Sequence, residues 1–180
     1  MATHDVLHGI GVSAGTAAAP AAIVQPAPGV DTSEPGSVDA AADGARVREA
    51  LAAVSSRLSE RAAKAPEETK AILKATAQLA GDRGLAKAVD KKLKKGLGLT
   101  QAVHDAVEDY AQMLRSLGGY MAERATDLYD VRDRAICELR GLPEPGVPAF
   151  DGPVVLVARD LAPAETATLN PETVLGIITE

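Results

Sequence analysis

Three histidines and one cysteine are the side chains in this chain best suited to chemistry, and their spacing completes no site. His4 and His8 lie four residues apart in a glycine-rich segment, where no predicted helix brings them together and no carboxylate or cysteine pattern completes a metal site. His104 stands beside Val103 at the edge of a predicted helix face, and Cys137 has no histidine nearby in sequence. We interpret the histidines as surface or core-edge residues and Cys137 as a small buried hydrophobe.

A lysine-rich run suggests another kind of chemistry, the binding of phosphate. Its members are Lys87, Lys91, Lys92, Lys94 and Lys95. Because Asp90 interrupts the run and apolar residues recur within it at a spacing of four, a solvated helix face is favoured over a phosphate patch. The glycines at positions 9, 11 and 15 are spaced one residue too widely for a dinucleotide-binding loop and precede a predicted strand rather than follow one.

Composition narrows the class of protein. The 180 residues carry a net charge of −6, which disfavours nucleic acid and anionic membranes as partners because such binding depends on Lys and Arg. One cysteine forms no internal disulfide, no basic residue precedes Arg46 as a signal peptide would require, and no apolar run is long enough to span a bilayer. We therefore expect a cytoplasmic protein with neither nucleic acid nor membrane as a partner.

The middle of the chain has the periodicity of helices. Between residues 38 and 140, apolar residues recur every three or four positions, and glycines separate the segments, which predicts an antiparallel bundle of four or five helical segments. The first should run from about residue 38 to 64, and Thr100 is the expected N-cap of the fourth. Apolar residues that this periodicity assigns to buried faces include Ile72, Leu117 and Met121.

The two ends of the chain have the pattern of an α/β layer. A small-residue run that ends in Ile23-Val24 reads as a short strand, residues 154–157 and 174–178 read as buried strands, and residues 161–169 read as one helix between the last two. Proline-rich segments at 25–37 and 142–153 separate these ends from the helices. The sequence thus predicts a mixed α+β fold in which a helical bundle is inserted into an α/β layer with too few strands to be complete.

The residues at the ends resemble a known family. They are the pattern Gly9-Ile10-x-x-Ser13-x-Gly15-x-Ala17, the segment Glu123-Arg124-Ala125-x-Asp127, the stretch Val155-Leu156-Val157-Ala158-x-Asp160-Leu161-x-Pro163-x-Glu165-Thr166-Ala167-x-Leu169, and Val174-Leu175-Gly176-x-Ile178-Thr179. Together they resemble enzyme I of the bacterial phosphotransferase system, the phosphoenolpyruvate–protein phosphotransferases. The match is collinear over essentially the whole chain and weakest in the middle of the bundle.

The resemblance implies an architecture and an activity. It implies that residues 25–144 form an α-helical domain of the type that binds the phosphocarrier protein HPr, and that residues 1–24 and 145–180 form an incomplete swivelling phosphohistidine domain. Members of the family transfer a phosphoryl group from phosphoenolpyruvate to a histidine and then to HPr, which energises sugar uptake. Their phosphoenolpyruvate and Mg²⁺ are bound by a separate C-terminal domain, so we expect no cofactor in this chain.

The resemblance also implies site residues. Those expected to contact HPr are Ala71, Leu79, Asp82, Leu85, Tyr120 and Arg124. Thr166 matches a threonine whose hydroxyl holds the unphosphorylated histidine, although a helix-face residue is the alternative interpretation. The phosphoacceptor histidine itself should fall about seven residues after Glu180, so this chain alone is expected to be inactive and to represent a truncated N-terminal part. Gly81, Arg83 and Gly84 replace acidic or bulkier family residues, which predicts an altered charge pattern on the HPr partner.

Two other functions remain open at this point. One is a non-enzymatic helical module that binds HPr or another protein through the bundle. The other is part of the swivelling domain of a related pyruvate-utilising dikinase, which the helical insertion and the segment from Gly9 to Ala17 make the weaker alternative.

Overall fold

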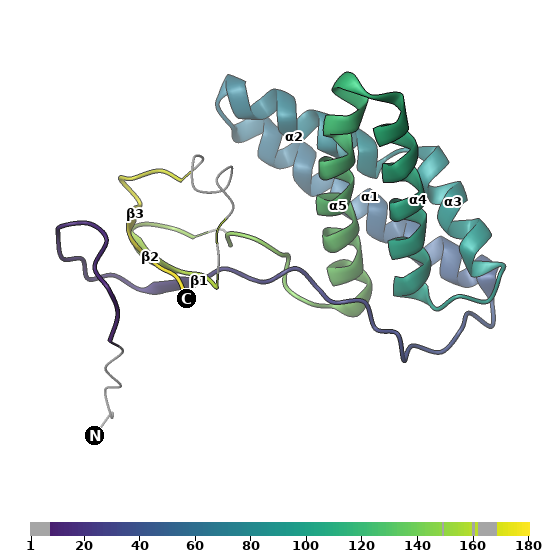
Figure 1. Cartoon of the computed structure of the whole chain (residues 1–180), viewed down its shortest axis with the longest axis horizontal. Coiled ribbons are helices and arrows are strands. Elements are labelled where there is room, and N and C mark those ends of the chain that lie inside the picture. The colour runs from purple at the N-terminus through teal and green to yellow at the C-terminus, as the bar shows by residue number, and fades with distance from the viewer. Residues whose placement is uncertain (1–7, 149, 160, 162–168) are drawn as a thin grey trace. The chain divides into compact units, whose positions relative to one another are not determined.

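The computed structural model describes residues 8–148, 150–159, 161 and 169–180. For Glu68, Tyr120 and Glu123 it describes the backbone but not the side chain. The chain divides into two compact units, one formed by Met1–Val24 with Val147–Glu180 and the other by Gln25–Gly146. The first unit holds the strands and the second holds the helices (Figure 1). A mixed α and β architecture with a helical bundle and a small parallel sheet was the sequence-based prediction, and it is confirmed.

The bundle has two helical hairpins and a shorter connecting helix. Its helices are α1 (Ala40–Lys64), α2 (Glu67–Ala80), α3 (Arg83–Leu93), α4 (Leu99–Leu117) and α5 (Gly119–Arg140). α1 packs along α2 and α4 along α5, while α3 lies against both α1 and α4 (Figure 1). Many of the buried positions are alanine, which lets the helix backbones approach closely and explains how a chain so poor in aromatic residues still forms a dense core. The largest fully buried side chains of this core include Leu58, Leu93, Leu128 and Ile136.

The start of α4 differs from the prediction. Thr100 lies inside the first turn instead of capping it, because the helix begins at Leu99 and Gly98 is the N-cap. The acceptor for the free N-terminal donors comes from a distant part of the chain: one carboxylate oxygen of Glu34 accepts hydrogen bonds from the Thr100 N–H (2.8 Å) and hydroxyl (2.7 Å). Since the partner is 66 residues away, no local capping pattern could reveal it.

The end of α5 is closed by a glycine, as expected. Gly141 adopts the left-handed conformation (φ 62°, ψ 29°), and the N–H of Leu142 donates to the carbonyl of Cys137 at 2.9 Å. These two features make a Schellman motif, which satisfies carbonyls that the helix leaves unpaired and turns the chain sharply.

Beyond this turn, the carboxylate of Glu144 is the centre of an ion-pair cluster. It accepts hydrogen bonds from Arg57 (2.6 Å) and Arg61 of α1 and from Arg134 (3.0 Å) of α5. Burial alone would raise the pKa of Glu144, but the three guanidinium charges and the Arg57 hydrogen bond outweigh it, so the pKa lies below its ordinary value. The cluster fastens the segment after α5 to the bundle.

The sheet contains β1 (Ala21–Ile23), β2 (Val154–Val157) and β3 (Val174–Ile178), all parallel and in the order β1-β2-β3. Two of the three strands match the predicted bounds, and β1 ends one residue before the expected end at Val24. The prediction that β3 is buried was wrong, because Leu175, Ile177 and Ile178 are exposed. A small core of Ala22, Val154 and Leu156 holds this unit together. The predicted helix at 161–169 falls almost entirely outside the described residues. Within the described part of the chain, no helix is both long and apolar enough to cross a membrane.

Candidate partner-docking surface

The residues expected to bind a partner lie on α2, on the turn after it, at the start of α3 and on the first turns of α5. Of these helices, α2 and α5 pack against each other. Ala71 is exposed on α2, and Leu79 is partly buried against the bundle core. Arg124 lies near the start of α5, where its guanidinium donates to Asp127 at 2.6 Å. Tyr120 belongs to the first turn of α5, and its side chain lies outside the described part of the structure.

The other two expected residues have structural roles. Leu85 is 1% exposed and lies in the bundle core, so a partner on the surface does not reach its side chain. Asp82 caps α3, because its carboxylate accepts the N–H of Leu85 at 2.9 Å. The same oxygen accepts the hydroxyl of Tyr110 at 3.3 Å. These two residues therefore shape the junction between α2 and α3.

Apolar side chains that the periodicity placed in the core are exposed in the structure. Ile72 on α2 is 57% exposed, Leu117 at the end of α4 is 65% exposed, and Met121 in the first turn of α5 is 46% exposed. The prediction of buried positions was wrong for these three because helical periodicity shows which residues share a face, but not whether a neighbouring helix extends far enough to cover it. Met113, one turn before Leu117, is exposed as well.

We call Ile72, Met113, Leu117 and Met121 the exposed apolar set. Three of them flank the α4–α5 turn, in which Gly118 (φ 70°) and Gly119 (φ 53°) reverse the chain, and the fourth lies on the helix that packs against α5. Large apolar side chains that remain in water on neighbouring helices are typical of a surface that another protein covers.

The surface of α4 and α5 also has an aromatic residue held between cations. The guanidinium of Arg132 lies 4.9 Å and that of Arg115 lies 5.3 Å from the ring centre of Tyr129. The Tyr129 hydroxyl donates to Glu108 at 3.1 Å. This cluster fixes the side chains between the two helices and gives the surface both charge and rigidity.

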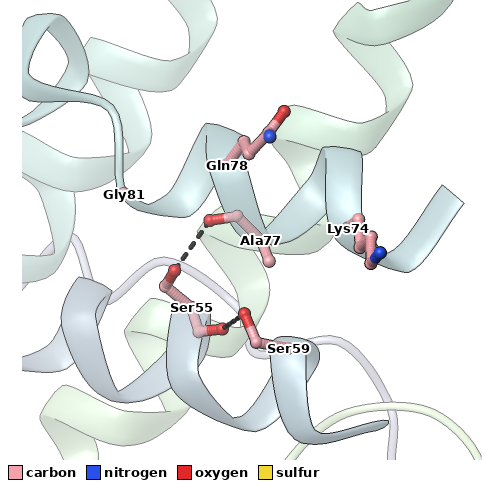
Figure 2. Close-up of a pocket in the computed structure, with 6 residues that line it drawn as sticks. All are labelled: Ser55, Ser59, Lys74, Ala77, Gln78 and Gly81. Atoms are coloured by element: carbon pink, nitrogen blue, oxygen red, sulfur yellow. Dashed lines mark hydrogen bonds between the residues drawn. The ribbon is translucent and has the colours of Figure 1, made fainter. Parts of the chain in front are cut away.

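A groove of about 370 Å³ runs between α1 and α2 (Figure 2). Its lining residues are Ser55, Ser59, Lys74, Ala77, Gln78 and Gly81. The Ser55 hydroxyl donates to the carbonyl of Ala77, and the Ser59 hydroxyl donates to the carbonyl of Ser55, each at 2.8 Å. Both hydroxyl protons are therefore already used in hydrogen bonds to helix backbone. Figure 2 shows Gln78 directed away from Ser55. The polar groups do not converge on one point, so the groove lacks the arrangement of a catalytic pocket.

In the sheet unit, a hollow of about 790 Å³ lies at the carboxyl ends of the strands. Residues that line it include His8, Ile10, Val24, Val157 and Thr179. The carboxyl edge of a parallel sheet is where α/β proteins commonly place their ligands and catalytic loops. Thr166, the expected supporting residue, lies outside the described residues.

The remaining candidates for chemistry stay isolated. His104 contacts the neighbouring Asp105 at 3.1 Å, and His8 is exposed. Cys137 is buried as expected, and burial together with the charge of Asp133 raises the pKa of its thiol, which makes it a poor nucleophile. No group of three or more potential metal ligands occurs among the residues placed by the structure.

Comparison with known proteins shows which family model and which relatives this chain matches. Residues 8–124 match the family model described as PEP-utilising enzyme, N-terminal. A phosphoenolpyruvate-protein phosphotransferase of Streptomyces coelicolor is 44% identical over 142 residues, and one of Haloferax volcanii is 34% identical over 113 residues. These matches cover 79% and 63% of this chain, but only 26% and 20% of the relatives, so the chain spans about a quarter of their length.

Solved structures agree with the sequence relatives. A solution structure of Enzyme I superposes with a TM-score of 0.68 at 30% identity, covering 89% of this chain and 70% of that one. A structure described as the N-terminal domain of Enzyme 1-Nitrogen gives a TM-score of 0.58 at 25% identity, over 89% of this chain and 68% of the other. The chain therefore belongs to the family described as PEP-utilising enzyme, N-terminal, and it has the fold of the Enzyme I N-terminal domain.

Proposed function

We propose that the bundle docks a phosphocarrier protein of the HPr type, within a phosphotransferase that passes a phosphoryl group from phosphoenolpyruvate to a histidine and then to that carrier. The relatives named phosphoenolpyruvate-protein phosphotransferases support the reaction class, which is a transfer. The observation that carries the docking proposal is the exposed apolar set, whose four side chains lie on α2 and around the α4–α5 turn. The docking face includes Ala71 and Arg124 on the same helices and excludes the buried Leu85.

The chemistry that this docking serves is one of positioning. Phosphoryl transfer between two histidines depends on holding donor and acceptor nitrogens in line, so most of the protein's work is to bind the carrier in one orientation. Rigid helices that present a preformed apolar surface suit that task, because little conformational freedom is lost on binding. Phosphoenolpyruvate and Mg²⁺ would be held by a further domain of the parent enzyme, which would also be a partner of this chain.

We further propose that the acceptor histidine follows β3, at the carboxyl edge of the sheet, and that Thr166 supports it there. His4, His8 and His104 are then not acceptors. Incubation with phosphorylated HPr should leave no acid-labile phosphate on these three histidines. A stable phosphohistidine at any of them, found by mass spectrometry under alkaline conditions, would contradict this assignment.

Docking is tested by a titration of the ¹⁵N-labelled chain with HPr encoded in the same genome. We expect chemical-shift changes confined to α2 and to the residues around the α4–α5 turn. In matched calorimetry, Ile72→Ala and Met121→Ala should each weaken binding about 5- to 30-fold, because each removes an apolar contact of the size typical for an interface anchor. No shift change at millimolar HPr would overturn the proposal.

Leu142→Ala provides the matched control. Leu142 is 43% exposed, similar to Met121, but it follows the far end of α5, some 30 Å along the helix axis at about 1.5 Å per residue. Its replacement should leave the affinity for HPr unchanged. Equal losses for Leu142→Ala and Met121→Ala would mean that the exposed apolar set is not the docking face.

A further inference from the structure

Positive charge is concentrated on one helix of an acidic chain. Residues 83–95 contain six basic side chains and one acidic one, a net charge of +5. The whole chain has 19 basic and 25 acidic residues, so the remaining residues have 13 and 24, a net charge of −11. The segment, which consists of α3 and the turn after it, therefore carries a strong charge of the sign opposite to that of the rest.

Pairing within the bundle accounts for only part of this charge. Asp90, the one acidic residue, is turned towards α1, where it accepts hydrogen bonds from Arg48 at 2.9 and 3.0 Å. Lys92 pairs with Asp109 of α4 at 2.7 Å. The other five cations are exposed, and none has an ion pair within the described parts of the chain. We call these five the basic stripe: Arg83, Lys87, Lys91, Lys94 and Lys95.

The stripe occupies a single face. At about 100° per residue, Arg83, Lys87 and Lys91 fall within an arc of roughly 80° on the side of α3 opposite its buried face, and Lys94 and Lys95 follow in the turn after the helix. That buried face consists of Leu85, Val89 and Leu93, each 1% exposed. From Arg83 to Lys91 the stripe extends about 12 Å along the helix at 1.5 Å per residue. The cations thus form a continuous positive ridge on the outer side of the bundle.

The stability of α3 does not account for this ridge. Arg83, Lys87 and Lys91 follow one another at a spacing of four within α3, and like charges at that spacing destabilise a helix by a few tenths of a kcal/mol per pair. Arg83 also stands in the first turn, next to the positive end of the helix dipole, where a positive charge is unfavourable, although the Asp82 carboxylate caps the same end. An anionic partner would compensate these unfavourable interactions.

We propose that the basic stripe binds an acidic patch on the docked phosphocarrier, so that the partner of this chain is recognised through positive charge on α3. This inference rests on the proposed docking function and identifies the chemistry of its partner. α3 directly follows α2, which carries part of the docking face, and the two helices are separated only by Gly81 and Asp82. An acidic protein fits better than nucleic acid, because residues 83–98 contain no aromatic side chain for base stacking and the chain as a whole is acidic.

The test reverses charge on the stripe and compares it with the same change elsewhere. The variant Lys87→Glu/Lys91→Glu and the control Arg46→Glu/Lys64→Glu alter the net charge equally, and all four residues are exposed on helices of the bundle. HPr from the same genome is titrated into each protein at 50 and 500 mM salt, with helicity and melting temperature recorded alongside. We expect the stripe variant to bind about 10- to 30-fold more weakly at 50 mM salt, mainly through slower association, and the control to bind within about 3-fold of the parent. At 500 mM salt the difference should fall to about 3-fold or less, because screening acts over a few Å.

The possible outcomes separate the two proposals. Equal affinities of parent, stripe variant and control would overturn the acidic-patch inference and leave HPr docking intact. Failure of the parent itself to bind HPr would overturn both. Affinity of the parent for duplex RNA or DNA that disappears in the stripe variant, with HPr binding unchanged, would assign the stripe to nucleic acid instead. Restored binding of the stripe variant to an HPr with one acidic residue changed to lysine would identify the facing patch directly.

Discussion

The Asp82 carboxylate serves two neighbours with a single oxygen, which accepts both the Leu85 N–H and the Tyr110 hydroxyl. Burial raises the pKa of Tyr110, and the charge of Asp82 and the hydrogen bond to it add to the effect. The residue thus joins the start of α3 to α4 as well as capping a helix. At this scale, one side chain determines both local helix stability and the ionisation of a neighbour.

Two substitutions of Asp82 separate these effects. Asp82→Asn keeps a good N-cap but removes the charge, so the pKa of Tyr110 should fall towards its ordinary value while stability changes little. Asp82→Ala should lower the pKa of Tyr110 in the same way and also cost about 1 kcal/mol of unfolding free energy. Alkaline absorbance titration, with Tyr110→Phe to assign the signal, and urea unfolding measure the two quantities. An unchanged Tyr110 pKa in both variants would refute the coupling.

Residue burial shows where sequence-based prediction succeeds and where it fails. Val47, Leu51 and Leu93 recur at helical spacing in the sequence and are buried in the structure. Ile72, Leu117 and Met121 have the same spacing but are exposed, since periodicity does not show where neighbouring helices end. The failures are informative, because the proposed docking face consists largely of apolar residues that the fold itself leaves uncovered.

At the scale of elements, helix existence and order were predictable, and the long-range contacts that fasten them were not. Glycines and apolar spacing identify all five helices, and aliphatic runs identify β2 and β3. The partners Glu34 and Thr100 are 66 residues apart, and Arg57 and Glu144 are 87 apart, so no local pattern relates them. Such contacts follow from tertiary packing, which a single sequence does not encode in its periodicity.

The Glu144 cluster gives a prediction that depends on pH. Because its folded-state pKa is lowered, Glu144 contributes stability that is fully present above the unfolded-state pKa of about 4.3 and is lost as the pH falls through the folded-state pKa. Glu144→Gln should therefore cost about 1 to 3 kcal/mol at pH 7, between the values for surface and buried pairs. The difference between parent and variant in unfolding free energy should shrink below about pH 4. A difference that is constant between pH 7 and 3 would contradict the proposed role of the charge.

At the scale of the whole molecule, the two units have separate cores of very different size. The bundle core includes buried side chains from all five helices, whereas that of the sheet unit has, among the described residues, three buried ones with a few partly buried neighbours. Because burial of apolar surface is the main source of stability, most of the stability should reside in the bundle.

We therefore expect residues 25–146 to fold alone. This piece retains every helix, the Glu144 cluster and the backbone pairing of Gln25 with Gly146. Its melting temperature should lie within a few degrees of that of the main transition of the full chain, measured by circular dichroism at the helical band. Hydrogen exchange of the full chain should show slower exchange in α4 and α5 than in β1 or β3. Loss of helicity in the isolated piece would show instead that the bundle depends on the sheet unit.

The pairing of Gln25 with Gly146 has a further consequence. Its two backbone hydrogen bonds, of 3.1 and 2.8 Å, bring together the points at which the chain enters and leaves the bundle. A domain whose two ends meet in this way can be removed, replaced or circularly permuted without stretching its host. We therefore expect that a bundle with a different surface charge, grafted between these two residues, would change which carrier the proposed docking face selects without any change to the sheet.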